Sequence, residues 1–395
     1  MTLLQINATD GFGSTGLIAR GIENCARQAG MDTYMAYMFS NRHDERNLKV
    51  GHTLDHKIHA LLSRLTGKQS YFSRCATKKL LKYIDTVHPD VVHLHNMHNN
   101  YCHLNMVLKH LASRHIKTVL TLHDCWFYTG GCFHYVNYNC RQWVTGCQHC
   151  PQKASLFFDS CHTVFNDRKR YFENIEDLTV VGVSNWIAGE AQKGLFKNKK
   201  VCCIHNGVDV SFFQPTESDF RQRYHLEGQY VIAALSSKLM EPKNAECLNR
   251  LLDYAKDNPQ VSILLFGGRL NGKNLPENVR DLGFIRSREE LRNLFSSSDL
   301  FVNVSLQDSL SLISLEAQAC GLPVVVYNNT GLPETVCPDY GYIVETGDIE
   351  HLFSAISDAR QKGKSYFAPH CRRWVEENFD QQKNYQQYID LYQNL

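Results

Sequence analysis

The sequence lacks the features that would direct the protein into a membrane or onto a nucleic acid. It has no run of about 18 apolar residues, the length that a membrane-spanning helix needs. Residues 1–7 have no basic start and only a short apolar run, so we expect no secretory signal peptide. The formal net charge is only +2, which leaves no basis for general nucleic-acid binding. We therefore expect a cytoplasmic protein without a nucleic-acid partner.

The sequence does have length and an abundance of cysteine. Its 395 residues predict two domains, each with its own core. Without an export signal, the fifteen cysteines are better explained as thiols or metal ligands than as a disulfide framework. Cys132, Cys140, Cys147 and Cys150 lie close together in a polar, Gly-rich segment. Four thiolates would hold a structural zinc ion that orders this segment, and unpaired thiols or disulfides are the alternatives.

A glycine-rich turn follows the first predicted strand, at residues 3–7. Gly11, Gly13 and Gly16 have the spacing Gly-x-Gly-x-x-Gly, ahead of a helix predicted over residues 17–28. A dinucleotide site would also need an acidic residue after the second strand, which ends in Ser-Asn-Arg instead. The glycine spacing therefore predicts a loop that faces a phosphate group or the acceptor, and a simple tight turn is the alternative.

Two further strands of the buried type end in histidine, at His95 and His123. Ligands of open α/β sheets bind beyond the carboxyl ends of the strands, so both side chains are expected to face a site. His93, His98 and His103 lie nearby, but no carboxylate cluster accompanies them, and we do not expect a metal there.

Residues 56–85 have a helical pattern that mixes lysine and arginine with leucine and tyrosine. A basic amphipathic surface of this kind can dock on anionic lipid head groups. Ordinary helices that pack on the sheet are the alternative.

The alternation of strands and helices restarts at residues 230–235. Lys238 and Lys243 follow, two mobile charges that can grip a diphosphate. Further on, Asp308 and Glu316 lie eight residues apart on a predicted helix that ends at Gly321. Asp308 would lie near the start of this helix, where backbone N–H groups and the helix dipole favour an anion. A ligand with a diphosphate and several hydroxyls suits this arrangement.

These motifs resemble those of the retaining GT-B glycosyltransferases of family 4. Asp308, Glu316 and the Cys-Gly-Leu-Pro-Val-Val of residues 320–325 resemble the Glu-x7-Glu motif of that family and its continuation, with Asp in place of the first Glu. The Thr-x-His that ends at His123 and the Asn-Gly-Val-Asp of residues 206–209 are similar to two further family motifs. The resemblance covers nearly the whole chain.

The resemblance implies an α/β protein of the GT-B fold, with two Rossmann-like doubly wound domains that face each other across a cleft. We expect residues 1–208 to form the acceptor-side domain, with a Cys-rich insert at about residues 125–151. Residues 209–375 would form the donor domain, and a helix over about residues 376–395 would return to the first domain.

The resemblance also implies roles for individual residues. Asp308 and the neighbouring backbone would hold the donor sugar, Glu316 the nucleotide ribose, and His123 would contact the sugar near its reacting carbon. The lysines would stabilise the departing diphosphate, so no catalytic cofactor is expected. The predicted catalytic residues are His123, Asp308 and Glu316, and the predicted donor-binding residues are Gly13, Gly16, Lys238, Lys243, Arg286, Ser309, Leu310 and Glu316.

Similar Cys-rich insertions occur in family members that build bacterial exopolysaccharide, capsule or O-antigen. The expected reaction moves a hexose-type sugar, with retention, from a UDP- or GDP-linked donor to a hydroxyl of a glycan linked to polyprenyl diphosphate. Such an acceptor implies peripheral contact with the inner membrane surface. Because Asp308 and Lys238 replace the usual Glu and Arg, a zinc-stabilised binding or adaptor module on a degenerate scaffold is the alternative, and a dehydrogenase is a third.

Overall fold

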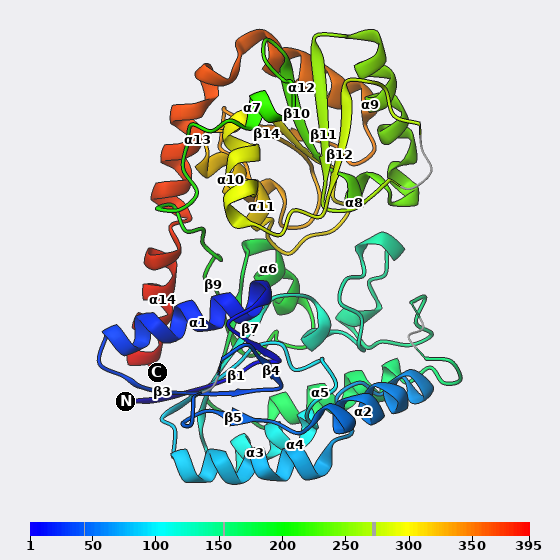
Figure 1. Cartoon of the computed structure of the whole chain (residues 1–395). Helices are drawn as coiled ribbons and strands as arrows, with labels where there is room; N and C mark the ends of the chain where they lie inside the picture. Colours follow the sequence, from blue (N-terminus) through cyan, green and yellow to red (C-terminus); the bar gives the residue numbers. More distant parts are fainter. Residues whose placement is uncertain (43, 153–154, 271–273) are drawn as a thin grey trace. The chain divides into compact units, whose positions relative to one another are not determined.

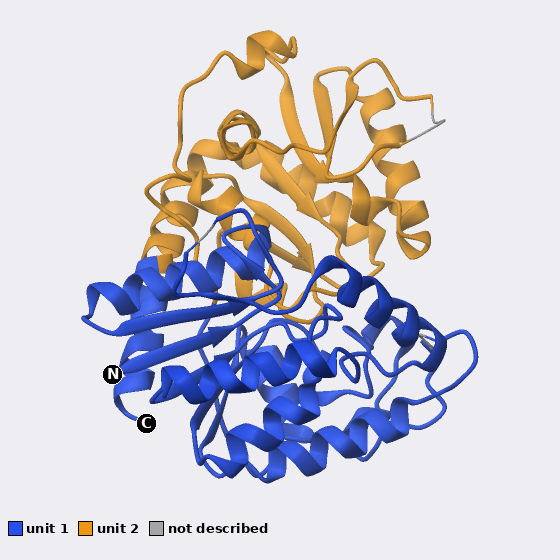
Figure 2. Cartoon of the chain, turned by 60° about the horizontal axis from the view of Figure 1, so that its bottom comes forward, with its two compact units in different colours: residues 1–205, 382–395 blue, residues 206–381 orange. Residues whose placement is uncertain are grey.

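The computed structural model describes residues 1–42, 44–152, 155–270 and 274–395, which form two compact α/β units. The first unit consists of residues 1–205 and 382–395, and the second of residues 206–381 (Figures 1 and 2). The chain leaves the first unit once and returns to it through its last helix. No helix in the described ranges has the length and apolar composition of a membrane span.

A seven-stranded parallel sheet forms the centre of the first unit. Its strand order is β5-β3-β1-β6-β7-β8-β9, so the chain starts in the middle and winds first to one edge and then to the other. A short parallel ladder of β2 and β4 lies beside it. The strands are β1 (Thr2–Ile6), β2 (Thr9–Asp10), β3 (Asp32–Tyr37), β4 (Phe39–Ser40), β5 (Leu48–Lys49), β6 (Val91–Leu94), β7 (Lys117–Leu122), β8 (Leu178–Gly182) and β9 (Lys200–Cys203).

Helices cover both faces of this sheet, with α1 on one side and α3 and α4 on the other (Figure 1). The last helix, α14, is anchored by buried tyrosines. The Tyr392 hydroxyl lies 2.7 Å from His93 Nδ1, and the Tyr388 hydroxyl lies 3.2 Å from Thr121 Oγ1. These bonds fix α14 to β6 and β7. The helices are α1 (Gly13–Gln28), α2 (Thr53–Thr66), α3 (Arg74–Val87), α4 (Leu104–Ser113), α5 (Cys161–Glu173), α6 (Asn185–Lys193) and α14 (Gln381–Gln393).

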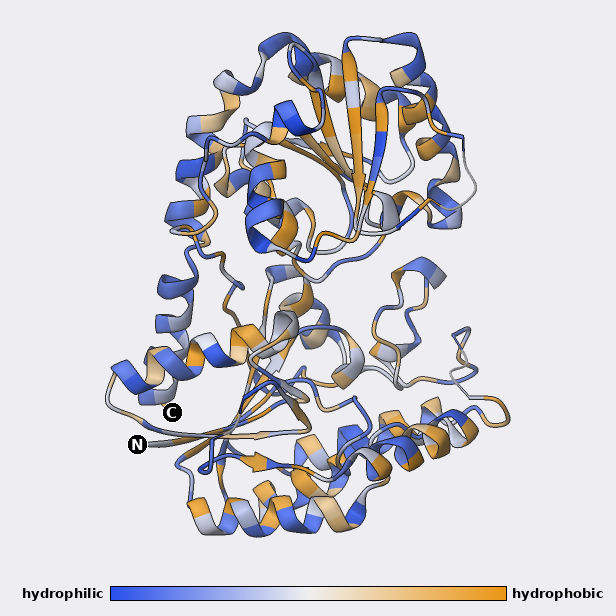
Figure 3. Ribbon diagram, viewed as in Figure 1, coloured by the Kyte–Doolittle hydropathy of each residue, from blue (hydrophilic) through white to orange (hydrophobic). Residues whose placement is uncertain are grey.

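The second unit repeats this architecture around a six-stranded parallel sheet of order β12-β11-β10-β13-β14-β15. Every residue of β11 is buried, as expected for a parallel strand covered on both faces. Figure 3 shows the hydrophobic colouring of these strands. The strands are β10 (Tyr230–Leu235), β11 (Val261–Phe266), β12 (Val279–Gly283), β13 (Leu300–Asn303), β14 (Val324–Tyr327) and β15 (Tyr342–Val344). The helices are α7 (Phe220–Arg223), α8 (Ser236–Leu239), α9 (Ala245–Asp257), α10 (Arg288–Ser297), α11 (Leu312–Ala319), α12 (Ile349–Lys362) and α13 (Lys364–Asn378).

The fold class predicted from the sequence, two doubly wound parallel sheets, is confirmed, and several helices differ in extent from the prediction. The helical pattern of residues 56–85 is divided into α2 and α3, because Gly67 ends α2 with a φ of 74°. The helix predicted to begin near Asp308 begins at Leu312. The Asp308 carbonyl accepts a hydrogen bond from the N–H of Gly331, which holds residues 308–311 in a loop.

The Asn-Gly-Val-Asp motif lies at a crossing of two chain segments within the second unit. The N–H of Val208 donates to the carbonyl of Phe379, and the N–H of Gln381 donates to the carbonyl of Val208. A Cβ at position 207 would lie 2.3 Å from the Gln381 Cα, so only glycine permits this approach. The same pairing separates α13 from α14, so the helix predicted over about residues 376–395 begins only at Gln381.

Candidate active site

The two lysines predicted to bind diphosphate follow β10 directly. Lys238 lies in α8, and Lys243 is exposed in the 3-10 helix η4 (Pro242–Asn244). Asn244 is buried, and its Nδ2 donates to the carbonyls of Lys238 at 3.0 Å and of Val304 at 2.8 Å. Because Val304 follows β13, this amide ties the lysine segment to the end of the neighbouring strand. Lys238 Nζ also lies 3.4 Å from Glu241 Oε1, a partly exposed ion pair of the kind that contributes little stability.

Asp308 lies in the loop between β13 and α11, and a second loop locks it in place. Its N–H donates to Thr330 Oγ1 at 2.9 Å, and its carbonyl accepts from the N–H of Gly331 at 3.0 Å. A Cβ at position 331 would lie 2.0 Å from the Ser309 carbonyl oxygen. Burial raises the pKa of the Asp308 carboxyl, and the charge of Lys238 opposes this rise. The structure thus brings Lys238 and Asp308 close enough for their charges to interact.

Ser309 and Leu310, also predicted to bind the donor, continue this loop. The Leu310 N–H donates to Asp308 Oδ1 over a long 3.3 Å. The Ser309 hydroxyl is buried and has no hydrogen-bond partner among the described residues. A buried hydroxyl without a partner is unfavourable, and a ligand oxygen would satisfy it. Arg286, by contrast, is exposed in the connection between β12 and α10.

A buried polar network fixes the start of α11 to the end of β13. Asn303 Nδ2 donates to Ser311 Oγ at 3.0 Å and to Ser314 Oγ at 3.1 Å. Further along the helix, Gln318 Oε1 accepts from the N–H of Cys337 at 2.8 Å, and its Nε2 donates to the carbonyl of Ser314 at 3.0 Å. Fully paired buried networks make a local arrangement rigid. The sequence analysis did not identify this network.

Glu316, on α11, has a cationic neighbour that the sequence analysis also missed. Burial raises the pKa of the Glu316 carboxyl to about 7, and the charge of Arg288 opposes this rise. Arg288 begins α10, and its guanidinium lies 4.5 Å from the centre of the Phe212 ring and 3.7 Å from Asp209 Oδ2. No local motif marks an arginine 28 positions before the glutamate, so only the tertiary structure brings the two together.

In the first unit, the glycine-rich turn contains the start of α1, which begins at Gly13 rather than at residue 17. Gly13 has a φ of 66°, a conformation that glycine adopts without strain. Gly16 is buried, and a Cβ there would lie 2.8 Å from Thr9 Oγ1. Glycine is therefore required at position 13 by the backbone conformation, and at position 16 by the close approach of Thr9.

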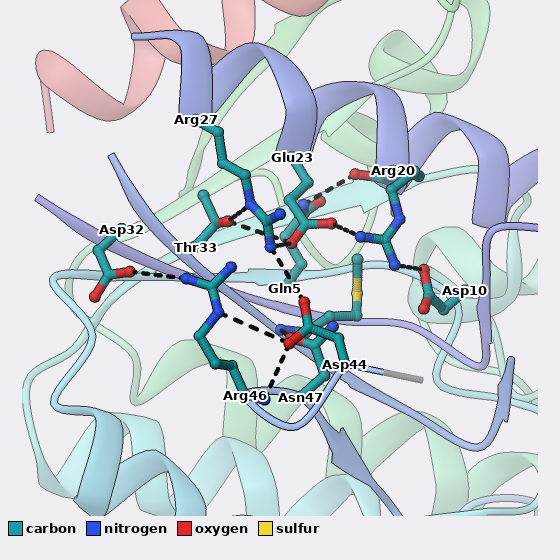
Figure 4. Close-up of polar contacts among 12 residues, drawn as sticks. Gln5, Asp10, Arg20, Glu23, Arg27, Asp32, Thr33, Asp44, Arg46 and Asn47 are labelled. Atoms are coloured by element: carbon teal, nitrogen blue, oxygen red, sulfur yellow. Dashed lines mark hydrogen bonds and ion pairs between the residues drawn. The ribbon is translucent and has the colours of Figure 1, made fainter. Parts of the chain in front are cut away.

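A network of charges on β2 and α1 holds this turn (Figure 4). Arg20 forms ion pairs with Asp10 and, at 2.5 Å, with Glu23. Arg27 also binds Glu23, at 2.8 Å, and Thr33 Oγ1 donates to the same carboxylate at 3.2 Å. Asp10 and Glu23 are almost completely buried, and their pairing compensates for the loss of hydration. Because Asp10 directly precedes Gly11, the network fixes the start of the turn.

His123 follows β7 and is held by a chain of hydrogen bonds from β1 and β6. Gln5 Nε2 donates to the carbonyl of Ala19 at 2.9 Å, which leaves Gln5 Oε1 to accept from His95 Nε2 at 2.9 Å. His95 Nδ1 is then the acceptor, so His123 Nε2 donates to it at 3.1 Å. Burial lowers the pKa of His123 to about 4. His123 is therefore neutral at pH 7, with Nε2 protonated and Nδ1 able to accept a hydrogen bond.

Asp124 and His98 lie beside this chain. His98 Nε2 lies 3.1 Å from Asp124 Oδ2, and the N–H of Trp126 donates to Asp124 Oδ1 at 2.9 Å. Burial alone would raise the pKa of Asp124, but the bond with His98 and the backbone bond lower it overall. His93 is bound to Thr121 Oγ1 and to a tyrosine of α14, which gives this histidine a structural role.

Buried aromatic side chains order the Cys-rich segment after residue 124. It contains only three short 3-10 helices, η1 (Trp126–Tyr128), η2 (Val136–Tyr138) and η3 (Gln142–Val144). The Trp143 ring packs against Tyr135 and Tyr128, with ring centres 4.8 and 5.2 Å apart. Buried Arg168 stacks on Trp126 at 3.7 Å and donates to the carbonyl of Thr129 at 2.7 Å. The segment packs through these contacts.

The four predicted zinc ligands do lie together. Cys132, Cys140, Cys147 and Cys150 line a cavity of about 20 Å³ with Cys161. All cysteines are free thiols, and burial raises the pKa of Cys132 to about 11 and that of Cys147 to about 12. Within the described ranges no three His, Cys, Asp or Glu side chains are arranged to hold a metal ion, so the predicted structural zinc is not supported.

Comparison with known proteins agrees with this architecture. Residues 22–212 match the family model described as Glycosyltransferase Family 4, and residues 216–381 match the model described as Glycosyl transferases group 1. The putative colanic acid biosynthesis glycosyl transferase WcaC of Escherichia coli is 23% identical over the full length of both chains. UDP-Gal:alpha-D-GlcNAc-diphosphoundecaprenol alpha-1,3-galactosyltransferase of Escherichia coli is 26% identical over 49% of this chain and 54% of its own.

Solved structures share the fold over the whole chain. The Anabaena protein Alr3699/HepE in complex with UDP has a TM-score of 0.67 at 17% identity, with 100% of both chains covered. Sucrose-phosphate synthase from Thermosynechococcus elongatus has a TM-score of 0.71 at 18% identity, with 100% of this chain and 98% of its own covered. With a family 4 model over its first half and a group 1 model over its second, the chain belongs to the GT-B glycosyltransferases.

Proposed function

We propose that the protein transfers a hexose-type sugar, with retention of the anomeric configuration, from a UDP- or GDP-linked donor to a hydroxyl of a lipid-linked bacterial surface glycan. The observation that carries this proposal is the gathering of Lys238, Asp308 and the unpartnered Ser309 hydroxyl beyond β10 and β13. The strand order reverses between these two strands, which is where doubly wound sheets bind nucleotides.

Different residues of the second unit would bind different parts of the donor. Lys238, Lys243 and the backbone of Leu310 would stabilise the charge that develops on the departing diphosphate, which is the largest contribution such sites make to catalysis. Ser309 and Asp308 would bind the donor sugar. The Glu316 carboxylate would accept hydrogen bonds from the ribose, and Arg288 would help to keep it ionised.

In the first unit, His123 would contact the donor sugar near its reacting carbon. Because its Nε2 already donates to His95, we propose that Nδ1 accepts a hydrogen bond from a sugar hydroxyl. Gly13 and Gly16 would form the part of the turn that faces the acceptor. We do not propose the two-carboxylate route of many glycosidases, since Asp308 and Glu316 have the binding roles above.

The lipid-linked acceptor is supported by the galactosyltransferase relative, whose name specifies a diphosphoundecaprenol-linked substrate. The similarity to that relative covers about half of each chain, so this part of the proposal needs its own test.

Nucleotide sugars can be screened by thermal shift, because a ligand that binds only the folded state raises the apparent stability. With the donor identified, release of the nucleotide diphosphate is measured with a polyprenyl-diphosphate-linked acceptor. We expect Lys238→Ala and Glu316→Ala each to lower the rate at least about a hundredfold. Lys256→Ala, which removes an exposed lysine near the end of α9, is the matched control and should be neutral.

Unchanged rates in both variants would refute these site assignments. Donor binding without turnover would instead favour a binding or adaptor module on an inactive scaffold. Proton NMR of the first product establishes whether the anomeric configuration is retained, and an inverted product would contradict that part of the proposal.

A further inference from the structure

His98 and Asp124 form a polar pair at the carboxyl ends of two neighbouring strands of the first unit. His98 lies in the loop after β6 and Asp124 in the loop after β7, and because these strands are parallel, both loops lie at the same edge of the sheet. The pKa of Asp124 is lowered, so its carboxylate only accepts hydrogen bonds at neutral pH. His98 Nε2, 3.1 Å from Asp124 Oδ2, therefore carries a proton and is the donor in this bond.

The other ring nitrogen of His98 has no hydrogen-bond partner in the part of the chain that the structure describes. This Nδ1 atom is buried, and only 8% of the residue is exposed. His93 and His95, on the same strand and its end, have partners for both ring nitrogens. An unpaired buried nitrogen is unfavourable. A ligand hydroxyl can donate or accept a hydrogen bond, so it satisfies Nδ1 in either protonation state of the imidazole.

The rings of Trp126 and Phe133 pack on the His98 imidazole, and they differ in freedom. The Trp126 ring centre is 5.5 Å away, but this side chain is completely buried and its Nε1 donates to Gln69 Oε1 at 2.9 Å. The Phe133 ring centre is 4.7 Å away, and Phe133 is 41% exposed. Its carbonyl accepts from the N–H of Cys125 at 2.8 Å, which holds the backbone. The Phe133 side chain can therefore turn aside by itself, as exposed side chains do within nanoseconds.

The loop that carries His98 also contacts the glycine-rich turn. Asn96 Nδ2 donates to Thr15 Oγ1 over a long 3.4 Å. Thr15 lies between Gly13 and Gly16, the two glycines proposed to face the acceptor, in the first turn of α1. His98 follows Asn96 by two positions, so it lies on the loop that meets the acceptor-facing turn. This placement favours the acceptor over the donor as the ligand of His98.

We propose that His98 binds a hydroxyl of the saccharide acceptor through Nδ1, while the Phe133 ring turns aside and packs against the same sugar. Ligand sites combine a few placed polar groups with apolar or aromatic surface, and an exposed phenyl ring supplies such surface. The bond from Nε2 to Asp124 fixes the orientation of the imidazole, so Nδ1 offers its hydrogen bond in one direction. The identity of the ligand as an acceptor glycan rests on the proposed function, whereas the site rests on the contacts above.

A purely structural explanation would be that His98 serves only to hold Asp124. Two substitutions distinguish this explanation from the proposal, because each keeps the equivalent of one ring nitrogen. In His98→Gln the amide reaches the position of Nε2 and still donates to Asp124, but nothing replaces Nδ1. In His98→Asn the amide reaches the position of Nδ1, and the bond to Asp124 is lost.

The assay measures transfer from the identified donor to polyprenyl-diphosphate-linked mono- and disaccharides, and slow transfer to water in their absence. We expect His98→Gln to raise the KM for the acceptor about tenfold, the size of effect that corresponds to one lost hydrogen bond. The KM for the donor and the rate of transfer to water should not change. In His98→Asn the KM for the acceptor should stay close to that of the unaltered protein, even if kcat falls.

His110→Gln is the matched control. His110 Nε2 also lies 3.1 Å from a carboxylate oxygen, that of Asp85. This pair lies near the ends of α4 and α3, which lead into the amino ends of β7 and β6, at the opposite edge of the sheet. The substitution should therefore leave the KM values for donor and acceptor unchanged.

Movement of the Phe133 ring is tested with Phe133→Trp. We expect the fluorescence of this tryptophan to change when the acceptor saccharide is added, beyond any change of the four native tryptophans. Tyr138→Trp, at a 54% exposed position of the same Cys-rich segment, should show no such change and is the control. Equal responses at both positions would contradict the proposed movement.

A raised KM for the acceptor in His98→Asn but not in His98→Gln would overturn the proposal, because the imidazole would then only hold Asp124. An unchanged KM for the acceptor in both variants, or a raised KM for the donor in His98→Gln, would also overturn it. Calorimetry with the same saccharides and no donor separates this proposal from the proposed function. If no sugar is transferred but saccharide affinity falls in His98→Gln alone, the proposed function fails and the role of His98 stands, whereas an unaltered protein that binds no saccharide refutes that role.

Discussion

Replacing Glu316 by glutamine is expected to make the protein more stable at high pH while it weakens nucleotide binding. Burial raises the pKa of this carboxyl from an ordinary 4.5 to about 7. The folded state therefore holds the proton more tightly than the unfolded state does. The stability that this group contributes is complete below pH 4.5 and is lost as the pH rises through 7.

The size of the effect follows from the shift. A difference of about 2.5 pKa units corresponds to ~3 kcal/mol of free energy of unfolding, since one unit is about 1.4 kcal/mol. Glutamine has the shape of the protonated acid and carries no charge. Glu316→Gln should therefore match the unaltered protein at pH 5 and exceed its stability by up to ~3 kcal/mol at pH 8.5.

Calorimetry without ligand at pH 5 and pH 8.5 measures this difference. We expect the melting temperature of the second unit to rise by about 10 °C at the higher pH alone. Glu377→Gln, an exposed position on α13, is the control and should show no pH-dependent gain. A variant that is less stable at pH 8.5, or equally stabilised at both pH values, would refute the reasoning. The affinity for nucleotide diphosphate should fall at pH 8.5, because the carboxylate would be lost as an acceptor.

Three further predictions concern positions that hold the site. Gly331→Ala places a Cβ 2.0 Å from the Ser309 carbonyl oxygen and should lower both the melting temperature and the affinity for nucleotide. Gly189→Ala, whose Cβ has no neighbour within 4 Å, should be tolerated, and equal melting temperatures and affinities for the two variants would contradict this. Arg168→Ala removes the bonds that hold the Cys-rich segment and should expose it to limited proteolysis at least about tenfold faster, and an unchanged digestion rate would count against the packing argument. Long-range ¹H–¹⁵N NMR should find His123 protonated at Nε2, and in His95→Phe the imidazole of His123 should be a mixture of both tautomers. Protonation of His123 at Nδ1 in the unaltered protein would disprove the assignment.

The glycines of the chain show how far local sequence can predict structure. Gly13 was expected in a turn because of its spacing, and its φ of 66° gives the reason for glycine at that position. Gly16 and Gly207 are needed because another segment approaches, Thr9 in one case and Gln381 in the other. The spacing identified these positions as special, but only the approach of a distant segment shows which requirement each one meets.

The Cys-rich segment shows where a local pattern misled. Four cysteines in a polar, Gly-rich stretch predict a zinc site as long as the stretch is assumed to have no core of its own. Trp126, Trp143 and Tyr128 supply that core, and Arg168, from a helix further along the chain, closes it. Aromatic residues spread over some twenty positions do not form a periodic pattern, so no local signal indicated that they would meet.

The sequence by itself determined the fold class, and its resemblance to a family named the residues proposed to bind the donor. Alternating apolar runs and turn residues suffice for the fold class, since they act over short distances along the chain. The strand order, and with it the switch point of each sheet, came only from the structure. Only the tertiary structure decided the electrostatic state of the site. Arg288 comes to lie near Glu316, Lys238 near Asp308, and the chain from Gln5 through His95 sets the tautomer of His123. These effects depend on burial and on distances between residues far apart in the sequence, which no motif encodes.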